Sequence, residues 1–177
     1  MQRRLYHFAS CPYCEKVRLA LALAGLDYAS HEIDPADRSE VVAVSGQPLV
    51  PVLVEPDGTV LHESNLILRQ LATLPEAQLL PQARRDQALT WVLVDRADAV
   101  LAPLCRRGGG GALHEELGVL EGLLERGPFL FGERPSLADA CFHAFLNRMP
   151  AADRDRAIEG WPRVRGWYDR VVSAART

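Results

Sequence analysis

The sequence predicts an α/β unit over residues 1–75, a linker over 76–82 and an all-α unit over 83–177. Three observations support this organisation. Strand and helix patterns alternate in the first unit, Pro75 and Pro81 interrupt the chain at the junction, and every later pattern is helical. Because strand–helix–strand alternation connects parallel strands, we expect parallel pairing in the first half of the α/β unit.

The first predicted strand and helix enclose a Cys-Pro-Tyr-Cys motif at 11–14. Residues 5–8 are rich in aromatic and β-favouring side chains and predict the end of a strand. Residues 14–24 hold strong helix formers without glycine or proline and predict a helix. Proline is tolerated at the first helical position, which puts Pro12 at that position and Cys11 at the cap before it.

The position of Cys11 predicts a reactive thiol. A helix N-terminus carries roughly half a positive charge and unpaired N–H donors, so it stabilises an anion. Cys11 is therefore expected to ionise more readily than a free cysteine, and the thiolate is the nucleophilic form. Cys14 lies one turn further on the same helix face, within reach of the Cys11 sulfur. The pair favours reversible disulfide chemistry at one exposed nucleophile.

Two other interpretations of the motif stay open, half of a zinc site and an inert buried pair. No second Cys or His pair stands at ligand spacing, and Cys105 and Cys141 are isolated in apolar helical stretches. We therefore favour a redox or nucleophilic thiol pair and expect no metal.

The rest of the α/β unit alternates in the same way. The further expected elements are a strand at 28–33, a short helix at 39–44, strands at 50–54 and 59–61, and a helix capped by Ser64. Residues 55–58 (Glu-Pro-Asp-Gly) have the composition of a hairpin turn. The order βαβ-α-ββα is that of a thioredoxin-like domain.

The all-α unit is marked by apolar residues at helical spacing. Its expected helices run through 89–104 and 113–124, over 136–149, and from Pro162 to the end of the apolar stripe at Val172. The tetraglycine at 108–111 predicts a flexible connection, because it lacks the strand and the following Lys-Ser/Thr of a phosphate loop. Ser136 and Asp139 have the spacing of a capping box, with Asp in place of Glu or Gln.

Composition excludes several classes of function. Apolar residues make up 48% and charged residues 24% of the 177, which is near ordinary globular usage. A net charge of −3 gives no support for binding nucleic acid or an anionic membrane surface. No charged-then-apolar leader opens the sequence and no apolar run approaches membrane-spanning length. Four cysteines with one C-x-x-C fit a reduced, cytoplasmic location.

A family resemblance is carried by several motifs together. The Cys-Pro-Tyr-Cys quartet matches the glutaredoxin active site, and the whole chain resembles a small cysteine-type glutathione S-transferase, similar to the larger two-domain glutaredoxins. The other matching segments are Leu-Val-Pro-Val-Leu at 49–53, Glu63-Ser64, Ser-Leu-Ala-Asp-Ala at 136–140, and the helix from Trp161-Pro162 to Tyr168. The resemblance implies a thioredoxin-like N-terminal domain followed by an all-α helical-bundle domain.

The same resemblance implies which residues act. Cys11 and Cys14 are the catalytic pair, and glutathione is the co-substrate. The implied glutathione-binding residues are Pro12, Tyr13, Val50, Pro51, Glu63 and Ser64. A cis bond before Pro51 would present the backbone of Val50 to the cysteinyl part of glutathione. Glu63 and Ser64 would hold the γ-glutamyl ammonium and carboxylate. In this family Ser136 and Asp139 form a structural cap of the helical domain and are not catalytic.

Three departures from the family pattern are visible. Relatives place Lys or Gln two residues before the proline to hold the glycyl carboxylate, whereas this chain has Leu49, which leaves that contact to Gln47 or to a basic residue elsewhere. The helical unit, about 95 residues long, is short for a full-length transferase, which could reduce its electrophile pocket or dimer surface. A cysteine in place of the usual Tyr or Ser favours a mixed disulfide with glutathione.

Three functions follow as hypotheses. The first is a glutathione-dependent thiol–disulfide oxidoreductase acting through a Cys11–glutathione mixed disulfide. The second is a transferase that conjugates glutathione to small electrophiles. The third is a non-enzymatic interaction protein resembling the stringent starvation proteins, which the activated dithiol disfavours. The sequence leaves the physiological substrate open, and also whether the protein is a monomer or a homodimer.

Overall fold

The N-terminal part of the protein is built on a mixed β-sheet. The structure is a computed structural model that describes residues 2–175, and within them one sheet has the strand order β2-β1-β3-β4. Its strands are β1 (Arg4–His7), β2 (Ala29–Glu32), β3 (Val52–Val54) and β4 (Val60–His62). Strand β1 runs parallel to β2 and antiparallel to β3, so the parallel pairing expected from the strand–helix–strand pattern is confirmed.

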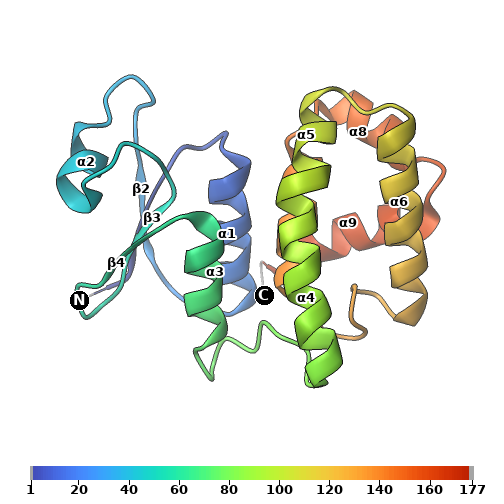
Figure 1. Ribbon diagram of the computed structural model, residues 1–177, viewed down its shortest axis with the longest axis horizontal. Coiled ribbons are helices and arrows are strands. Elements are labelled where there is room, and N and C mark those ends of the chain that lie inside the picture. The colour runs from blue at the N-terminus through green and yellow to red at the C-terminus, as the bar shows by residue number, and fades with distance from the viewer. Residues whose placement is uncertain (1, 176–177) are drawn as a thin grey trace.

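Side chains of this sheet are buried on both faces. Along β1, Leu5 joins the main apolar core, whereas its neighbour Tyr6 joins a smaller cluster with Val41 of α2. Successive strand residues point to opposite faces, so this alternation requires cover on both sides. Helices α1 (Pro12–Leu23) and α3 (Ser64–Ala72) cover the face toward the helical bundle, and α2 (Ser39–Ser45) covers the outer face (Figure 1).

The C-terminal part is helical, as expected. It contains α4 (Arg84–Arg96), α5 (Ala102–Arg106), α6 (Gly111–Leu123), α7 (Leu137–Asn147), α8 (Ala151–Ile158) and α9 (Pro162–Ala174). None of the helices in the described part of the chain is long and apolar enough to cross a membrane.

Two features of this part were not predicted. The helix expected through 89–104 begins earlier, at Arg84, and a π-helical segment, η1 (Ala97–Leu101), separates α4 from α5. A π-turn adds one residue to a helical turn, which an apolar pattern does not reveal. Helix α8 was missed because it buries only Ile158 and therefore lacks an apolar stripe.

The tetraglycine connects α5 to α6. Gly108, Gly109 and Gly110 have φ values of 81°, 95° and 101°, a region that side chains other than glycine rarely adopt. The chain therefore does connect two helices here, and three of the four glycines have backbone angles that favour glycine.

The two parts of the protein share one apolar core. Helix α1 packs against the central helix α7, in which ten of the eleven residues are buried, and residues of both parts belong to one buried cluster that includes Val17, Leu68 and Phe145. The sheet unit and the helical unit therefore meet along α1, directly beside the Cys-Pro-Tyr-Cys motif (Figure 1).

A buried carboxylate fixes the start of α7. Asp139 is fully buried and accepts hydrogen bonds from the backbone N–H and hydroxyl of Ser136, both at 2.7 Å, from the Leu130 N–H at 3.0 Å and from Trp167 Nε1 at 2.7 Å. The capping box is present, and it also ties α7 to α9. Burial raises the pKa of Asp139, an effect opposed by these hydrogen bonds. Each of these hydrogen bonds joins Asp139 to another part of the fold.

Candidate functional site

Cys11 stands at the N-terminus of α1. It occupies the N-cap with extended dihedral angles (φ −84°, ψ 118°), and Pro12 follows as the first helical residue, as the sequence predicted. The Cys11 side chain is half-buried, and its sulfur accepts the backbone N–H of Cys14 at 3.4 Å. Cys14 is completely buried one turn into the helix. Both thiols are free.

The two thiols differ in acidity. The pKa of Cys11 is lowered to about 6. The largest cause is a hydrogen bond from the Cys14 thiol. The backbone N–H groups of Cys14 and Tyr13 and the charge of Arg18 act in the same direction, and together these outweigh burial. The same thiol–thiol hydrogen bond and burial raise the pKa of Cys14 far above its usual value. At neutral pH the pair is therefore one thiolate, Cys11, stabilised by one protonated thiol, Cys14.

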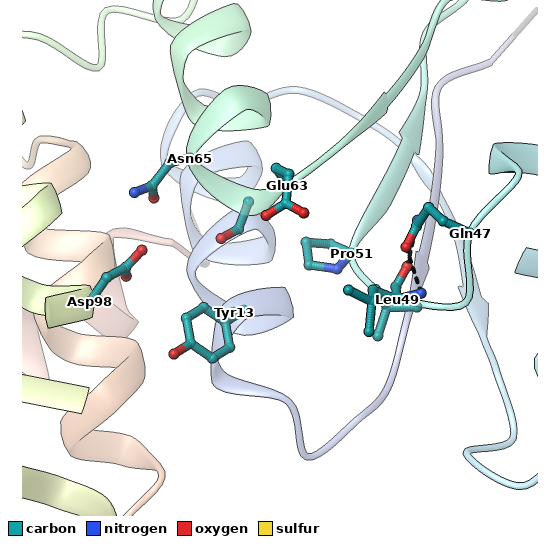
Figure 2. A pocket seen from close by; sticks show the side chains of 9 residues that line it. Tyr13, Gln47, Leu49, Pro51, Glu63, Asn65 and Asp98 are labelled. Atoms are coloured by element: carbon teal, nitrogen blue, oxygen red, sulfur yellow. Dashed lines mark hydrogen bonds between the residues drawn. The ribbon is translucent and has the colours of Figure 1, made fainter. Parts of the chain in front are cut away.

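A pocket of about 350 Å³ opens beside the start of α1. Its lining comes from α1, the loop before β3, the start of α3 and segment η1: Tyr13, Gln47, Leu49, Val50, Pro51, Glu63, Ser64, Asn65 and Asp98 (Figure 2). This volume lies within the range of small-molecule sites.

The start of α3 has an unusual backbone. Glu63 occupies the N-cap with a φ of 69°, a left-handed value that costs a non-glycine residue of order 1–3 kcal/mol and is typical of functional sites. Ser64 is already the first helical residue, so the prediction that Ser64 caps this helix is wrong. The left-handed turn at Glu63 brings the exposed Glu63 and the buried Ser64 to the same pocket.

The loop before β3 carries the cis proline. The Val50–Pro51 peptide bond is cis, as the resemblance implied. Gln47 holds this loop, because its side-chain amide donates to the Leu49 carbonyl at 2.9 Å and to the Ser45 hydroxyl at 3.0 Å and accepts the Leu49 N–H at 2.7 Å (Figure 2). Both amide hydrogens are therefore engaged, and Gln47 is not free to bind a ligand carboxylate.

Arg38 reaches the same loop from the N-terminus of α2. Its guanidinium donates to the Pro48 carbonyl at 3.3 Å and to the Pro35 carbonyl at 3.2 Å, and stacks 5.2 Å from the Phe8 ring. It forms no salt bridge with any described residue. Arg38 is therefore a cation at the loop where the sequence has Leu49 instead of Lys or Gln.

A buried ion pair closes the far wall of the pocket. Lys16, the only lysine of the chain, is completely buried and donates to Asp98 at 2.7 and 2.8 Å and to the Asn65 side-chain oxygen at 2.6 Å. Asp98 belongs to η1, so a carboxylate of the helical unit and Asn65 of α3 bind the same ammonium group and lie on the same side of the pocket (Figure 2). Sequence analysis missed this contact, although a lone lysine on the apolar side of a helix was a usable signal.

A second, smaller hollow lies between the start of α1 and helices α5 and α7. It has a volume of about 20 Å³ and is lined by Pro12, Tyr13, Ala102, Cys105, Arg106, Phe145 and Arg148. Cys105 is buried there, and burial raises the pKa of its thiol to about 12. The described residues contain no cluster of three or more His, Cys, Asp or Glu that could hold a metal ion.

Comparison with known proteins assigns the family. Residues 5–78 match the family model "Glutathione S-transferase, N-terminal domain" and residues 105–170 match "Glutathione S-transferase, C-terminal domain". A probable glutathione S-transferase from Nicotiana tabacum is 30% identical over 98% of this chain and 85% of its own length. The chain belongs to the glutathione S-transferase family.

Other known proteins match the chain in whole or in part. Prostaglandin E synthase 2 from Mus musculus is 36% identical over 76 residues, which is 41% of this chain and 20% of that protein. A glutathione S-transferase structure from Rhodospirillum rubrum F11 is 29% identical, with a TM-score of 0.79 over 96% of this chain and 87% of its own. A Pseudomonas fluorescens family member with two glutathione bound shares the fold at 20% identity (TM-score 0.78, 98% of this chain, 92% of that chain).

The predicted site residues of this glutathione S-transferase family chain lie in four places. Five of them line the pocket of about 350 Å³ together, although they come from distant parts of the sequence: Tyr13, Val50, Pro51, Glu63 and Ser64. Pro12 lines the small hollow with Tyr13. Cys11 and Cys14 lie at the start of α1 and flank Pro12 and Tyr13 in sequence, and neither cysteine is among the residues that line the two spaces. Ser136 and Asp139 lie in the buried capping box at the start of α7.

Proposed function

We propose that this glutathione S-transferase family protein is a glutathione-dependent thiol–disulfide oxidoreductase with Cys11 as its nucleophile. The observation that carries the proposal is the thiol pair, in which Cys11 has a pKa of about 6 and Cys14 stays protonated beside it. A conjugating transferase or a binding scaffold does not need a second thiol to stabilise the first.

The proposed reaction has two displacement steps. The Cys11 thiolate attacks the glutathione sulfur of a glutathionylated substrate, the substrate S–S bond breaks, and a Cys11–glutathione disulfide forms. The substrate leaves as a thiolate and takes a proton from water. The thiolate of a second glutathione then attacks the bound glutathione sulfur, which releases glutathione disulfide and restores the Cys11 thiolate. Because Cys14 holds its proton firmly, we favour free glutathione over Cys14 for this second step.

Glutathione is proposed to lie in the larger pocket with its cysteine toward Cys11. Its γ-glutamyl ammonium would meet Glu63, and its γ-glutamyl carboxylate would meet the Ser64 hydroxyl and the N–H groups at the start of α3. Its cysteinyl backbone would pair with Val50, and Arg38 would bind the glycyl carboxylate. On this proposal residues 1–75 form the glutathione-binding domain, 76–82 the linker and 83–177 the helical domain of a cytoplasmic enzyme.

Conjugation of electrophiles is the alternative activity. It needs an apolar electrophile pocket beside the sulfur, whereas the hollow next to Pro12 has room for about one water molecule. Small-molecule sites are usually ten or more times larger. This difference in volume favours reduction of disulfides over conjugation of aromatic electrophiles.

The test measures both activities on the same protein. Wild type and Cys11→Ser are assayed with a glutathione mixed disulfide and with 1-chloro-2,4-dinitrobenzene. We expect wild type to reduce the disulfide with little conjugation, and Cys11→Ser to lose the reduction. Conjugation by wild type in the absence of disulfide reduction would overturn the proposal. Activity of Cys11→Ser equal to wild type would do the same.

A further inference from the structure

Arg18 lies on the same face of α1 as the cysteine pair. Cys14 stands four residues before it and Cys11 seven, which is helical spacing for one face. Helical side chains lean toward the N-terminus, and Arg18 follows this direction, because its Nη2 donates to the Ala9 carbonyl at 3.2 Å. The guanidinium group therefore reaches back over about two turns, or about 10 Å, to the loop in front of the helix.

This loop, residues 8–10, joins β1 to the N-cap residue Cys11. It closes through the Cys11 N–H, which donates to the Phe8 carbonyl at 3.3 Å. Ala9 and Ser10 at its tip are exposed, and the hydrogen bond from Arg18 ties this tip to the helix. The position of Cys11 at the N-cap thus depends on a short loop that is held from the helix side by Arg18.

The charge of Arg18 acts on both ends of the same loop. Burial lowers the pKa of His7 at the end of β1, and the charge of Arg18 lowers it further. At the other end Arg18 lowers the pKa of Cys11, although it is the weakest of the causes that do so. Within residues 2–175 Arg18 forms no salt bridge. The guanidinium group therefore combines a small electrostatic effect on the thiol with a direct hydrogen bond to the loop.

These two effects have different consequences for the reaction. A charge changes the fraction of Cys11 that is ionised, so its loss no longer matters at a pH that ionises every molecule. A thiolate with a higher pKa is moreover the better nucleophile. A hydrogen bond that holds the loop changes where the sulfur lies, and its loss lowers the rate at every pH, because attack requires aligned reacting atoms.

We propose that Arg18 is a positioning residue, which holds the Cys11 sulfur in line for attack by bracing the 8–10 loop against α1. This inference rests on the proposed function, because it concerns the same displacement. The Cys11 thiolate attacks the glutathione sulfur, the S–S bond breaks, and the substrate leaves as a thiolate. Arg18 gives up no proton or electron pair in this step and acts through the Ala9 carbonyl and the N-cap.

Two variants separate the brace from the charge. Arg18→Met keeps an unbranched side chain and removes both, whereas Arg18→Lys keeps the charge and replaces the planar five-donor fork with one ammonium. The substrate is the mixed disulfide of glutathione and 2-mercaptoethanol. Its kcat/KM is measured across pH, because the profile gives a midpoint for ionisation of Cys11 and a plateau rate for the fully ionised thiol.

The plateau rate is the quantity that reports position. Arg18→Met should lower it by about tenfold, because a small misplacement of a reacting group is costly, and should raise the midpoint. Arg18→Lys should keep the wild-type midpoint and recover only part of the plateau rate. Arg69→Met is the matched control, an exposed arginine of α3 that stacks 4.4 Å from the Trp91 ring, and should match wild type in both quantities.

Two further measurements do not involve glutathione. The first is the plateau rate of Cys11 with 4,4′-dipyridyl disulfide, in which the thiolate attacks one sulfur and a pyridinethiolate leaves; Arg18→Met should lower this rate severalfold. The second is hydrogen exchange of the 8–11 segment, which should be faster in Arg18→Met than in wild type. If wild type does not reduce the glutathione disulfide, the proposed function fails, and these two measurements still decide the role of Arg18.

Two results would overturn the inference. One is an Arg18→Met plateau rate equal to or above that of wild type with only the midpoint shifted, which would leave Arg18 a purely electrostatic role. The other is unchanged hydrogen exchange of the 8–11 segment in Arg18→Met, which would mean that Arg18 does not brace the loop. Circular dichroism establishes that each variant is folded, and Arg18→Gln takes the place of Arg18→Met if the latter does not fold.

Discussion

Lys16 Nζ of α1 lies 2.7 Å from Asp98 Oδ1 of the π-helical segment η1, and this buried ion pair joins the sheet unit to the helical unit. The lysine is completely buried, while the Asp98 side chain is 24% exposed at the pocket. The pair therefore positions the pocket wall that the helical unit contributes.

Removing one member of this pair should destabilise the protein strongly. Asp98→Asn leaves the completely buried Lys16 ammonium without its carboxylate, and breaking a buried ion pair in this way costs about 3–5 kcal/mol in the free energy of unfolding. Chemical denaturation measures the loss. Arg156→Gln, which removes an exposed i,i+3 pair with Asp153, is the control and should cost less than about 1 kcal/mol. An Asp98→Asn variant as stable as the control would show that the pair does not hold the two units together.

Cys14 should set the acidity of Cys11. The hydrogen bond from the Cys14 thiol is the largest cause of the lowered pKa of Cys11, so Cys14→Ala should raise that pKa from about 6 toward the ordinary value near 8.5. Cys14→Ser keeps a hydrogen-bond donor and should raise it less. The pH dependence of Cys11 alkylation by iodoacetamide reports the change, because the rate rises as the pH passes through the pKa. Equal midpoints in the wild type and Cys14→Ala would mean that the helix N-terminus alone activates Cys11.

The two ends of glutathione should depend on different residues. Arg38→Gln should weaken glutathione binding by about tenfold, since it removes a charge-assisted contact to the glycyl carboxylate, but leave binding of the glycinamide analogue unchanged. Ser64→Ala should weaken both ligands alike, because it acts at the γ-glutamyl end. Calorimetric titration measures all four affinities. Equal losses of both ligands in Arg38→Gln would remove Arg38 from the glycyl site.

The capping box should matter for stability and not for chemistry. Ser136→Ala removes the hydroxyl that donates to the buried Asp139 carboxylate and keeps the backbone N–H that also donates to it, and should cost about 0.5–2 kcal/mol. The denaturation midpoint should fall while kcat of the folded enzyme stays near that of wild type. A variant with wild-type stability and no activity would instead make Asp139 part of the site.

The sequence by itself determined the elements whose causes are local. Three features were predicted in this way: proline at the first position of α1, the strand–helix–strand pattern, and the Ser136–Asp139 capping box. Each acts through backbone geometry or through hydrogen bonds within a few residues. The lowered pKa of Cys11 was also predicted, from its position at a helix N-terminus, whereas the hydrogen bond from the Cys14 thiol, its largest cause, was not predicted.

Only the tertiary structure decided which distant side chains meet. The reach of Arg38 to the Pro48 carbonyl and the meeting of Val50 with Glu63 in one pocket depend on how separate loops fold against each other. The Lys16–Asp98 pair joins residues 82 positions apart through a π-turn that no apolar periodicity reveals. Such contacts arise when α1 packs against the helical unit, because burial then forces each charged side chain to find a partner.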